Sequence, residues 1–264
     1  MARSSGCIVS DTDACAFLAS TGITDVTISN AVNDLVMDLK AASIWTKMTA
    51  LYPFVGGDAT KHSYNLKNPA TFQITWHGTV TQNANGMTGN GTTGYGDTGL
   101  VGDTNTTLND VHMSVYCRTV GGSSDNMYDL GAENGAGFAM LVSLKNQGAN
   151  GPTIGMIYRD DISTSWVLKS DASAEGHWIF SRRGTTDFEG YKNGTSFQTQ
   201  TNTNTGARPP RSFFIGAQNL AGTASNFSNR NLALVSIGTG LNDTEASDFY
   251  TAVQAFETAI SRQV

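Results

Sequence analysis

The sequence has little charge, few cysteines and prolines, and no long apolar run. Only 14% of its 264 residues are charged, the formal net charge is −6, and the basic residues do not cluster. A nucleic-acid or anionic-membrane binder needs a positive surface, and this composition does not supply one. No run approaches the ~18 apolar residues of a membrane span. We therefore expect neither nucleic-acid binding nor membrane insertion.

The amino-terminal residues and the cysteines bear on where the protein is made. Asp11 and Asp13 interrupt the apolar residues near the start, so we expect no signal peptide. The three cysteines, Cys7, Cys15 and Cys117, are odd in number and lack metal-type spacing. This pattern favours synthesis in a reducing cytoplasm. A protein that works outside the cell would then leave it by lysis.

Motifs for nucleophilic, zinc or nucleotide chemistry are missing. There is no G-x-S-x-G elbow, and the four histidines form neither H-x-H nor H-E-x-x-H. Residues 89–94 fit G-x-G-x-x-G, but 95–99 cannot form the helix that a dinucleotide site needs, which favours a flexible hairpin. We expect the histidines to be ordinary strand or surface residues. They are His62, His77, His112 and His177.

Asp187 and Glu189 are the one candidate pair for glycoside hydrolysis. Two residues apart on a strand, they would share a face, and a retaining glycosidase needs two carboxyl groups ~5 Å apart in a cleft. The pair lies between Gly184 and Gly190, which favours a solvated hairpin. We therefore expect no enzymatic activity, with hydrolysis kept as an alternative.

Calcium is the one cofactor that the sequence leaves open. Asp103, Asn105 and Thr107 have the alternating oxygens of a calcium loop, but Leu108 and Ser114 replace the Gly and Glu of an EF-hand. Any metal ligands therefore stay unknown.

The apolar pattern predicts an antiparallel all-β domain. Gly, Thr, Ser and Asn dominate, which is typical of short strands joined by turns. Phe72, Ile74 and Trp76 alternate with polar residues, as do the odd positions of 111–117, so both segments predict half-buried strands. Residues 83–94 and 200–210 are polar and predict surface loops. Further strands are expected at 138–145, 153–159, 165–169, 177–182 and 195–199.

Three helices and two buried strands complete the pattern. Residues 10–21 predict a short helix with Ser10 as its cap. A longer helix begins near Thr27 or Ser29, carries an apolar stripe from Ile28 to Trp45, and ends by Pro53. Strands at 212–217 and 231–238 are apolar on both faces. A closing helix starts near Asn242, and its apolar residues step by four, three and four. Those residues are Phe249, Val253, Phe256 and Ile260.

The chain resembles bacteriophage virion-surface proteins built on the concanavalin A-like (laminin-G or pentraxin type) jelly roll. The closing strand and helix look like the end of that fold, and a strand followed by a Tyr-x-Asn-Gly turn is similar to its hairpin. The likeness extends over nearly the full length. The segments that carry it are GLNDTE at 240–245, HWIFSR at 177–182, GYKNG at 190–194, YPFVGG at 52–57 and FYTAVQAF at 249–256.

This resemblance implies a fold and a function. The fold would be an antiparallel jelly-roll β-sandwich at 59–264, including a closing helix at 242–261, after a helical docking extension at 1–58. The protein would be a virion component, a capsid decoration, head fibre or tail protein, that contacts other virion proteins, forms a homo-oligomer and binds host glycans weakly. A dedicated sugar-binding adhesin is the alternative. The expected ligand-binding residues are Tyr95, Asp97, Tyr191 and Asn193.

Overall fold

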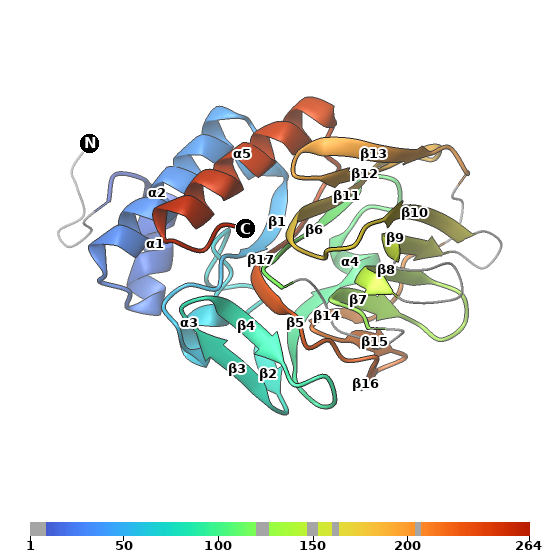
Figure 1. Ribbon diagram of the computed structural model, residues 1–264, viewed down its shortest axis with the longest axis horizontal. Helices are drawn as coiled ribbons and strands as arrows, with labels where there is room; N and C mark the ends of the chain where they lie inside the picture. Colours follow the sequence, from blue (N-terminus) through green and yellow to red (C-terminus); the bar gives the residue numbers. More distant parts are fainter. Residues whose placement is uncertain (1–8, 120–126, 147–152, 160–163, 204–206) are drawn as a thin grey trace.

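Two β-sheets pack face to face, and a layer of helices covers one of them (Figure 1). This arrangement is seen in a computed structural model, which describes residues 9–119, 127–146, 153–159, 164–203 and 207–264. Among the strands that the structure describes, every pairing is antiparallel except that of β15 (Gln218–Leu220) with β7 (Leu130–Glu133). The prediction of a jelly-roll sandwich with helices at both ends of the chain is confirmed.

Sheet A has eight strands and lies under the helices. β1 (Met48–Tyr52) pairs with β17 outside the main order of strands. The order across the sheet is β13 (Thr195–Gln200), β12 (Asp187–Lys192), β11 (Gly176–Gly184), β6 (Val111–Cys117), β17 (Asn231–Gly238), β4 (Gly86–Gly89) and β3 (Val80–Asn83).

Sheet B has nine strands and forms the other layer. Its small hairpin of β15 (Gln218–Leu220) and β16 (Thr223–Ser225) joins through β7. The order across the sheet is β10 (Thr164–Ser170), β9 (Thr153–Arg159), β8 (Ala139–Asn146), β7 (Leu130–Glu133), β14 (Ser212–Ile215), β5 (Tyr95–Val101) and β2 (Thr75–His77).

Alternate residues of the central strands divide between two apolar cores. Val115 of β6, Trp178 of β11 and Val235 of β17 face the core between the sheets. Their neighbours Tyr116 and Ile179 face the helices. Both faces of sheet A are therefore buried, as the doubly apolar 231–238 pattern predicts.

Helices α1 (Thr12–Thr21), α2 (Val26–Ala41) and α5 (Asp243–Ala259) form the layer on sheet A (Figure 1). Asn242 caps α5 in a capping box with Glu245, and the predicted stripe buries Phe249, Val253 and Phe256. The cap of α1 is Asp11 rather than Ser10, because the Asp11 carboxylate accepts from two free amides of the first turn. The amino-terminal helices thus dock on the sandwich.

Three further local predictions are wrong. The 111–117 segment, expected to be half-buried, forms the fully buried β6, because the helical layer covers its outer face. The second helix ends at Ala41 rather than reaching Trp45, and Met48–Tyr52, for which the sequence predicts no strand, forms β1 because it pairs with β17. The 83–94 segment contains β4 and the end of β3. The segment 1–58, expected to be a helical extension, therefore also contains β1, a strand of sheet A. Two short helices, α3 (Ala59–His62) and α4 (Gly102–Asn105), and the 3₁₀ turn η1 (Trp45–Lys47) complete the described elements.

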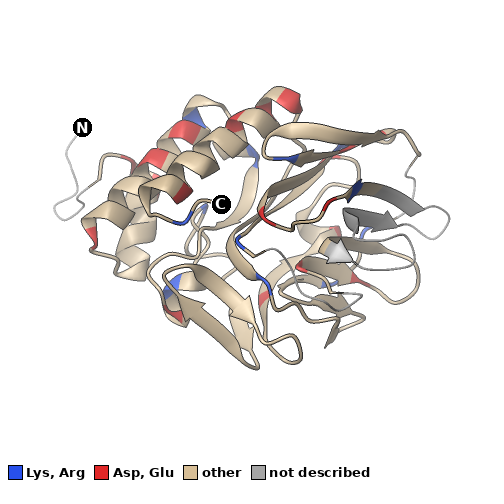
Figure 2. Ribbon diagram, viewed as in Figure 1, with Lys and Arg blue, Asp and Glu red and all other residues tan. Residues whose placement is uncertain are grey.

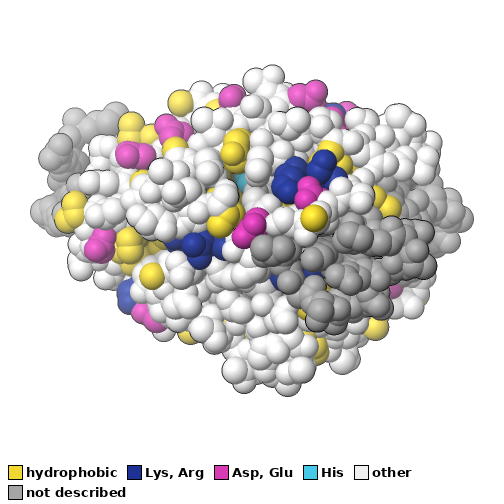
Figure 3. Space-filling model, in the orientation of Figure 1, with side chains coloured by type: hydrophobic (Ala, Val, Ile, Leu, Met, Phe, Trp, Pro, Cys, Tyr) yellow, Lys and Arg dark blue, Asp and Glu magenta, His cyan; other side chains and the backbone are white. Residues whose placement is uncertain are grey.

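Charge is unevenly distributed between the layers. Acidic residues follow the helices, whereas β2, β3 and β4 carry none (Figure 2). On the face shown in Figure 3, uncharged polar groups and backbone dominate, and the described basic side chains occur in small groups. The helical layer is therefore the acidic side of the molecule.

Candidate functional site

Tyr95 and Asp97 lie together on the outer face of sheet B. Tyr95 pairs with His77 of β2, and Asp97 pairs with both Thr75 of β2 and Phe214 of β14. Between them, Gly96 faces the core, where a Cβ would meet the side chains of Ile74 and Trp76. The strand alternation therefore turns Tyr95 and Asp97 outward.

Three rings gather around Tyr95. Together with it they form what we call the outer aromatic cluster, which consists of His77, Tyr95, Phe214 and Phe227. The rings of His77 and Tyr95 are stacked, with centroids 4.7 Å apart and an interplanar angle of 12°. On its other side Tyr95 meets Phe214 at 4.5 Å, and Phe227 lies 6.1 Å away. Phe214 is buried as the floor, Tyr95 and Phe227 are half-buried, and His77 is exposed.

The cluster offers both apolar and polar contacts to a ligand. Because His77 and Phe214 flank Tyr95, the ring surface left to a ligand belongs mainly to His77 and Phe227. Burial, and then the charge of Asp97, raise the pKa of the Tyr95 hydroxyl, so this group stays a neutral donor. One Asp97 oxygen accepts from the Gly99 amide at 2.9 Å, which orients the carboxylate. Ring stacking with adjacent hydroxyl and carboxylate groups suits recognition of a small polar molecule.

A structured loop borders the cluster. Residues 90–94 lead from β4 into β5, and the Asn90 side chain accepts from the amides of Thr92, Thr93 and Gly94 at 2.8–3.1 Å. The strand that follows excludes a dinucleotide site, as predicted. The expected flexible hairpin is instead a turn organised by Asn90, and it fixes the chain just before Tyr95.

Tyr191 and Asn193 lie elsewhere, in sheet A. Tyr191 belongs to β12 rather than to a turn, and its side chain is fully buried. Its hydroxyl donates toward Glu189 Oε2 at 2.8 Å and Asp243 Oδ1 at 2.9 Å. Asn193 does form the predicted turn, with φ of 50°, but its side-chain oxygen accepts from the His177 amide. The four expected ligand residues therefore separate into two places, and the sheet A pair is engaged in structural contacts.

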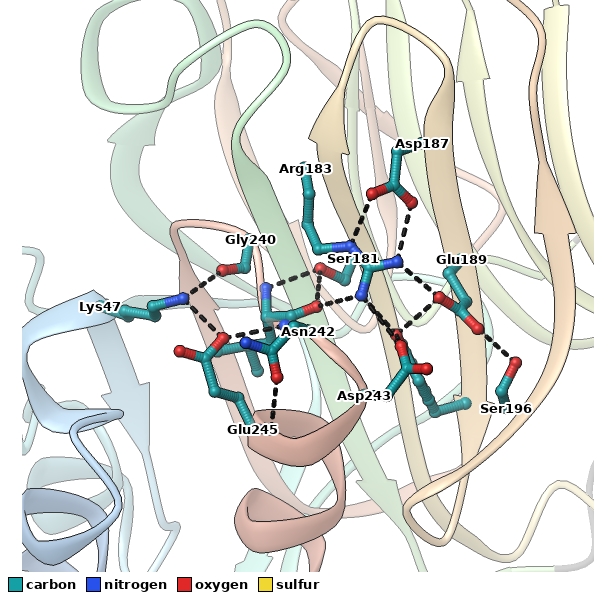
Figure 4. Close-up of polar contacts among 12 residues, drawn as sticks. Lys47, Ser181, Arg183, Asp187, Glu189, Ser196, Gly240, Asn242, Asp243 and Glu245 are labelled. Atoms are coloured by element: carbon teal, nitrogen blue, oxygen red, sulfur yellow. Dashed lines mark hydrogen bonds and ion pairs between the residues drawn. The ribbon is translucent and has the colours of Figure 1, made fainter.

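Arg183 occupies the space between the carboxylates of the expected acid pair (Figure 4). Its guanidinium reaches Asp187 at 2.8 and 2.9 Å, Glu189 at 2.6 Å and Asp243 at 3.0 Å. Asp187 and Glu189 do share a face, but Glu189 is buried and not solvated as expected. A retaining glycosidase needs both carboxyl groups facing a substrate, whereas here one guanidinium binds both of them.

The other half of the same polar region anchors α5. Lys47 binds Glu245 at 2.6 Å and the Gly240 carbonyl at 2.9 Å, while Ser181 exchanges hydrogen bonds with Leu241 (Figure 4). With Arg183 on Asp243, these contacts fix the amino end of the helix from two sides. The arrangement is that of a structural joint.

The described residues offer little for metal or thiol chemistry. Within the described ranges, no three His, Cys, Asp or Glu side chains are grouped to hold a metal ion. The Asn105 side chain of the candidate calcium loop accepts from the Val101 amide. Cys117 is buried, which raises the pKa of its thiol to about 12. Cys15 is disulfide-bonded, which the expectation of a reducing compartment did not anticipate, and Cys7 lies outside the described residues.

Sequence reasoning missed three members of the outer aromatic cluster. Phe214 was assigned to a buried strand, which it is, but it faces away from the main core. His77 and Phe227 are brought to Tyr95 by strand pairing and by a loop 132 residues downstream of it. A period-two pattern predicts which face of a strand each side chain occupies, but not which strands lie next to it. Only His77 therefore had a signal in the sequence, its place among the polar residues that alternate with Ile74 and Trp76.

Comparisons with known proteins recover the fold. No family model and no curated protein sequence matches the chain. Domain 4 of AbnA, an extracellular GH43 arabinanase from Geobacillus stearothermophilus solved with arabinotriose, is similar at TM-score 0.53 and 14% identity, covering 77% of this chain and 98% of that domain. A receptor binding domain is similar at TM-score 0.50 and 10% identity, covering 80% of this chain and 52% of the other.

A weaker likeness is to the NanB sialidase of Streptococcus pneumoniae, at TM-score 0.42 and 15% identity over 54% of this chain. This chain spans about half of the receptor-binding chain and 24% of NanB. At these identities the likeness to the arabinanase domain and the receptor binding domain defines a fold class alone, the two-sheet jelly-roll sandwich. Among the helices that the structure describes, none is long and apolar enough to cross a membrane.

Proposed function

We propose that this protein is a non-catalytic, lectin-like display protein that binds glycans weakly through the outer aromatic cluster. The observation that carries the proposal is the placement of His77, Tyr95 and Phe227 beside Asp97, on the sheet that α1, α2 and α5 do not cover. The C–H groups of a sugar pack on ring faces, and its hydroxyls bond to groups such as Tyr95 Oη and Asp97. Similarity in fold to a domain solved with arabinotriose supports the sugar as ligand class.

The display role is proposed for the surface of a bacteriophage virion, as a capsid decoration, head fibre or tail component. The sequence resemblance supports this setting, and the architecture suits it, because one face of the sandwich is sealed by helices and the other carries the cluster. The helical layer or the sheet edges would contact neighbouring virion proteins, in a homo-oligomer of cyclic symmetry. Many weak sites on one particle add up to useful avidity.

Binding is tested first with the intact protein on a glycan array that includes arabino-oligosaccharides, followed by calorimetry. We expect dissociation constants weaker than about 10 μM and a loss of at least tenfold in His77→Ala and Asp97→Asn, about 1.4 kcal/mol. Tyr250→Ala on α5 is the matched aromatic control and should bind normally. A repeat with a chelator tests calcium. Binding that survives both cluster variants would reject the site, and no binding to any glycan would reject the function.

In the adhesin alternative, the same site binds glycans at higher affinity. It is distinguished from the display role by how virus particles that lack the protein behave. Particles that lack a display protein would lose physical stability but still adsorb to cells, whereas loss of an adhesin would abolish adsorption. Copy number in the intact particle separates a capsid lattice from a tail. A hydrolytic activity that disappears in Asp187→Asn and Glu189→Gln would overturn the non-catalytic proposal.

A further inference from the structure

Two histidines and two serines lie on sheet A directly under α5, and we call them the buried histidine cluster. His112 and Ser114 come from β6, His177 from β11 and Ser236 from β17. The sequence predicts strand or surface histidines here, yet all four side chains have no exposed area. Most of the other residues at this interface are apolar, so a polar cluster at this place needs a physical explanation.

One chain of hydrogen bonds joins the four side chains. His112 Nδ1 lies 2.6 Å from the Thr239 carbonyl, so it carries a proton and donates. His112 Nε2 meets Ser236 Oγ at 3.0 Å, Ser236 meets Ser114 at 2.7 Å, and Ser114 meets His177 Nε2 at 3.3 Å. The chain ends at His177 Nδ1, which is buried and has no hydrogen-bond partner among the described residues. This network accommodates two neutral imidazoles.

Helix α5 packs the Phe249 ring against both imidazoles of the cluster. The edge-on contacts of Phe249 place its ring 4.9 Å from that of His177 and 6.1 Å from that of His112. Phe249 brings no counter-charge, and a protonated His177 would have no acceptor for its Nδ1 proton. While α5 is packed on sheet A, a positive charge on His177 is therefore not stabilised by a hydrogen bond from Nδ1 or by a charge on Phe249.

The charged groups around the cluster do not compensate. The positive charge of Lys47 disfavours protonation of His112. The negative charges of Asp110, just before β6, and of Glu245 on α5 favour it. A positive charge on His112 disfavours protonation of His177, which also lies beside the Tyr116 ring. Burial dominates and lowers the pKa of His112 to about 4 and of His177 to about 3.

We propose that the buried histidine cluster is an acid-sensitive release for α5, in which protonation of His112 and His177 favours a state with the helix lifted from sheet A. In that open state both imidazoles meet water and recover an ordinary pKa near 6.5. The open state therefore binds more protons than the closed one, and acidification shifts the equilibrium toward it. Opening would uncover the apolar outer face of sheet A, including Tyr116, Ile179 and Leu234.

Linkage gives the expected size of the effect. Between pH 7.5 and pH 5, one histidine that is free only in the open state raises the opening constant by about 30-fold. Two independent histidines raise it by several hundred-fold. The device goes beyond the proposed function and does not depend on it, because the cluster lies on the opposite sheet from the outer aromatic cluster.

The test is hydrogen exchange of the α5 amides in the intact protein, corrected for intrinsic rates, at pH 7.5 and about pH 5. We expect opening of α5 to rise several hundred-fold while β5 and β14 keep their protection. The single variants His112→Gln and His177→Gln should each show about a 30-fold rise, and the double variant almost none. His77→Gln, on the other sheet, is the matched control for the loss of a histidine, and the rise of its α5 opening should equal that of the parent.

Three outcomes would overturn the proposal. One is an α5 protection that does not change with pH, and another is a full acid response in the double variant, which would assign the effect to the Asp243 and Glu245 contacts. The third comes from NMR titration of the parent, which also serves if the variants fail to fold. Imidazole signals of His112 and His177 that titrate near pH 6.5 while α5 stays protected would exclude the device.

Discussion

Arg262 and Glu257 form a buried ion pair at the carboxyl end of α5. Arg262 Nε lies 2.8 Å from Glu257 Oε2, and Nη2 lies 2.9 Å from Oε1. The same guanidinium donates to the carbonyls of Phe54 at 2.8 Å and Pro53 at 2.9 Å. One side chain thus joins the helical layer to the segment that leaves β1.

Replacing Arg262 by Met should destabilise the protein by about 3–5 kcal/mol, because Glu257 would remain as a buried unpaired charge. Burial already raises the pKa of Glu257, and removing its partner would raise it further. Urea denaturation measures the free energy of unfolding, with Arg211→Met, on an exposed arginine, as control. Adding Glu257→Met to the variant should recover part of the loss. A cost below about 1 kcal/mol would contradict the importance of the pair.

The acid sensitivity of His62 is a separate prediction about global stability. His62 is buried near β3, with Nδ1 2.6 Å from Gln82 Oε1 and Nε2 accepting from the Gly57 amide, and burial lowers its pKa to about 4. The unfolded chain binds a proton at this residue near pH 6.5 and the folded protein does not, so stability falls as the pH drops from 6.5 toward 4.

In His62→Gln, the free energy of unfolding should fall less steeply over this range, by up to about 1.4 kcal/mol per pH unit and about 3 kcal/mol in total. Urea titrations at several pH values measure the slope for parent and variant. The exposed His77→Gln should leave the slope unchanged. Equal slopes in the parent and in His62→Gln would show that His62 accepts its proton while folded.

The sequence predicted the layers of this fold better than the partners within them. Period-two alternation predicts β6, and the run that is apolar on both faces predicts β17. The cap and the stripe of α5 are predicted because Asn242 and the apolar steps act locally. No strand is predicted at Met48–Tyr52, because a short apolar run does not reveal its partner and only the pairing with β17 makes it a strand. That pairing spans almost two hundred residues and leaves no local signal.

The candidate site shows the same division. Tyr95 and Asp97 share a strand face, which spacing predicts, whereas the rings that flank Tyr95 come from β2, β14 and a later loop. Tyr191 was expected in a turn because Asn193 and Gly194 follow it, but the turn begins only after Lys192. Arg183 could not be assigned to Asp187 and Glu189 from spacing alone, because i+4 and i+6 neighbours meet here only across a hairpin.

Arg183→Met should destabilise the joint between β12 and α5 by about 1–2 kcal/mol. Glu189 would become a buried carboxylate without its cation, while the exposed Asp243 would lose less. The arginine lowers the pKa of Asp243, which should therefore rise in the variant. Denaturant unfolding gives the stability, and NMR titration gives the carboxyl pKa. Adding Glu189→Gln should recover part of the loss, and additive single effects in this cycle would exclude the interaction.

Gly94 and Gly99 offer a matched pair that tests how the entry to β5 is held. A Cβ on Gly94 would lie 2.0 Å from the Thr79 carbonyl oxygen, whereas a Cβ on Gly99 meets nothing within 4 Å, although φ there is 65°. Gly94→Ala must therefore displace backbone, and we expect a cost of about 3 kcal/mol. Gly99→Ala should cost only about 1–2 kcal/mol for its left-handed conformation.

The two variants should also differ in ligand binding, because Gly94 directly precedes Tyr95 and its displacement would separate Tyr95 from His77. Urea denaturation and calorimetry with any glycan found on the array measure both effects. Gly99 lies in the same strand and is followed by the buried Leu100. Its variant therefore controls for backbone strain in β5 without a steric clash. Equal costs in the two variants would mean that the Thr79 contact does not hold the loop. In that case the stacking of Tyr95 on His77 would have to be fixed by strand pairing alone.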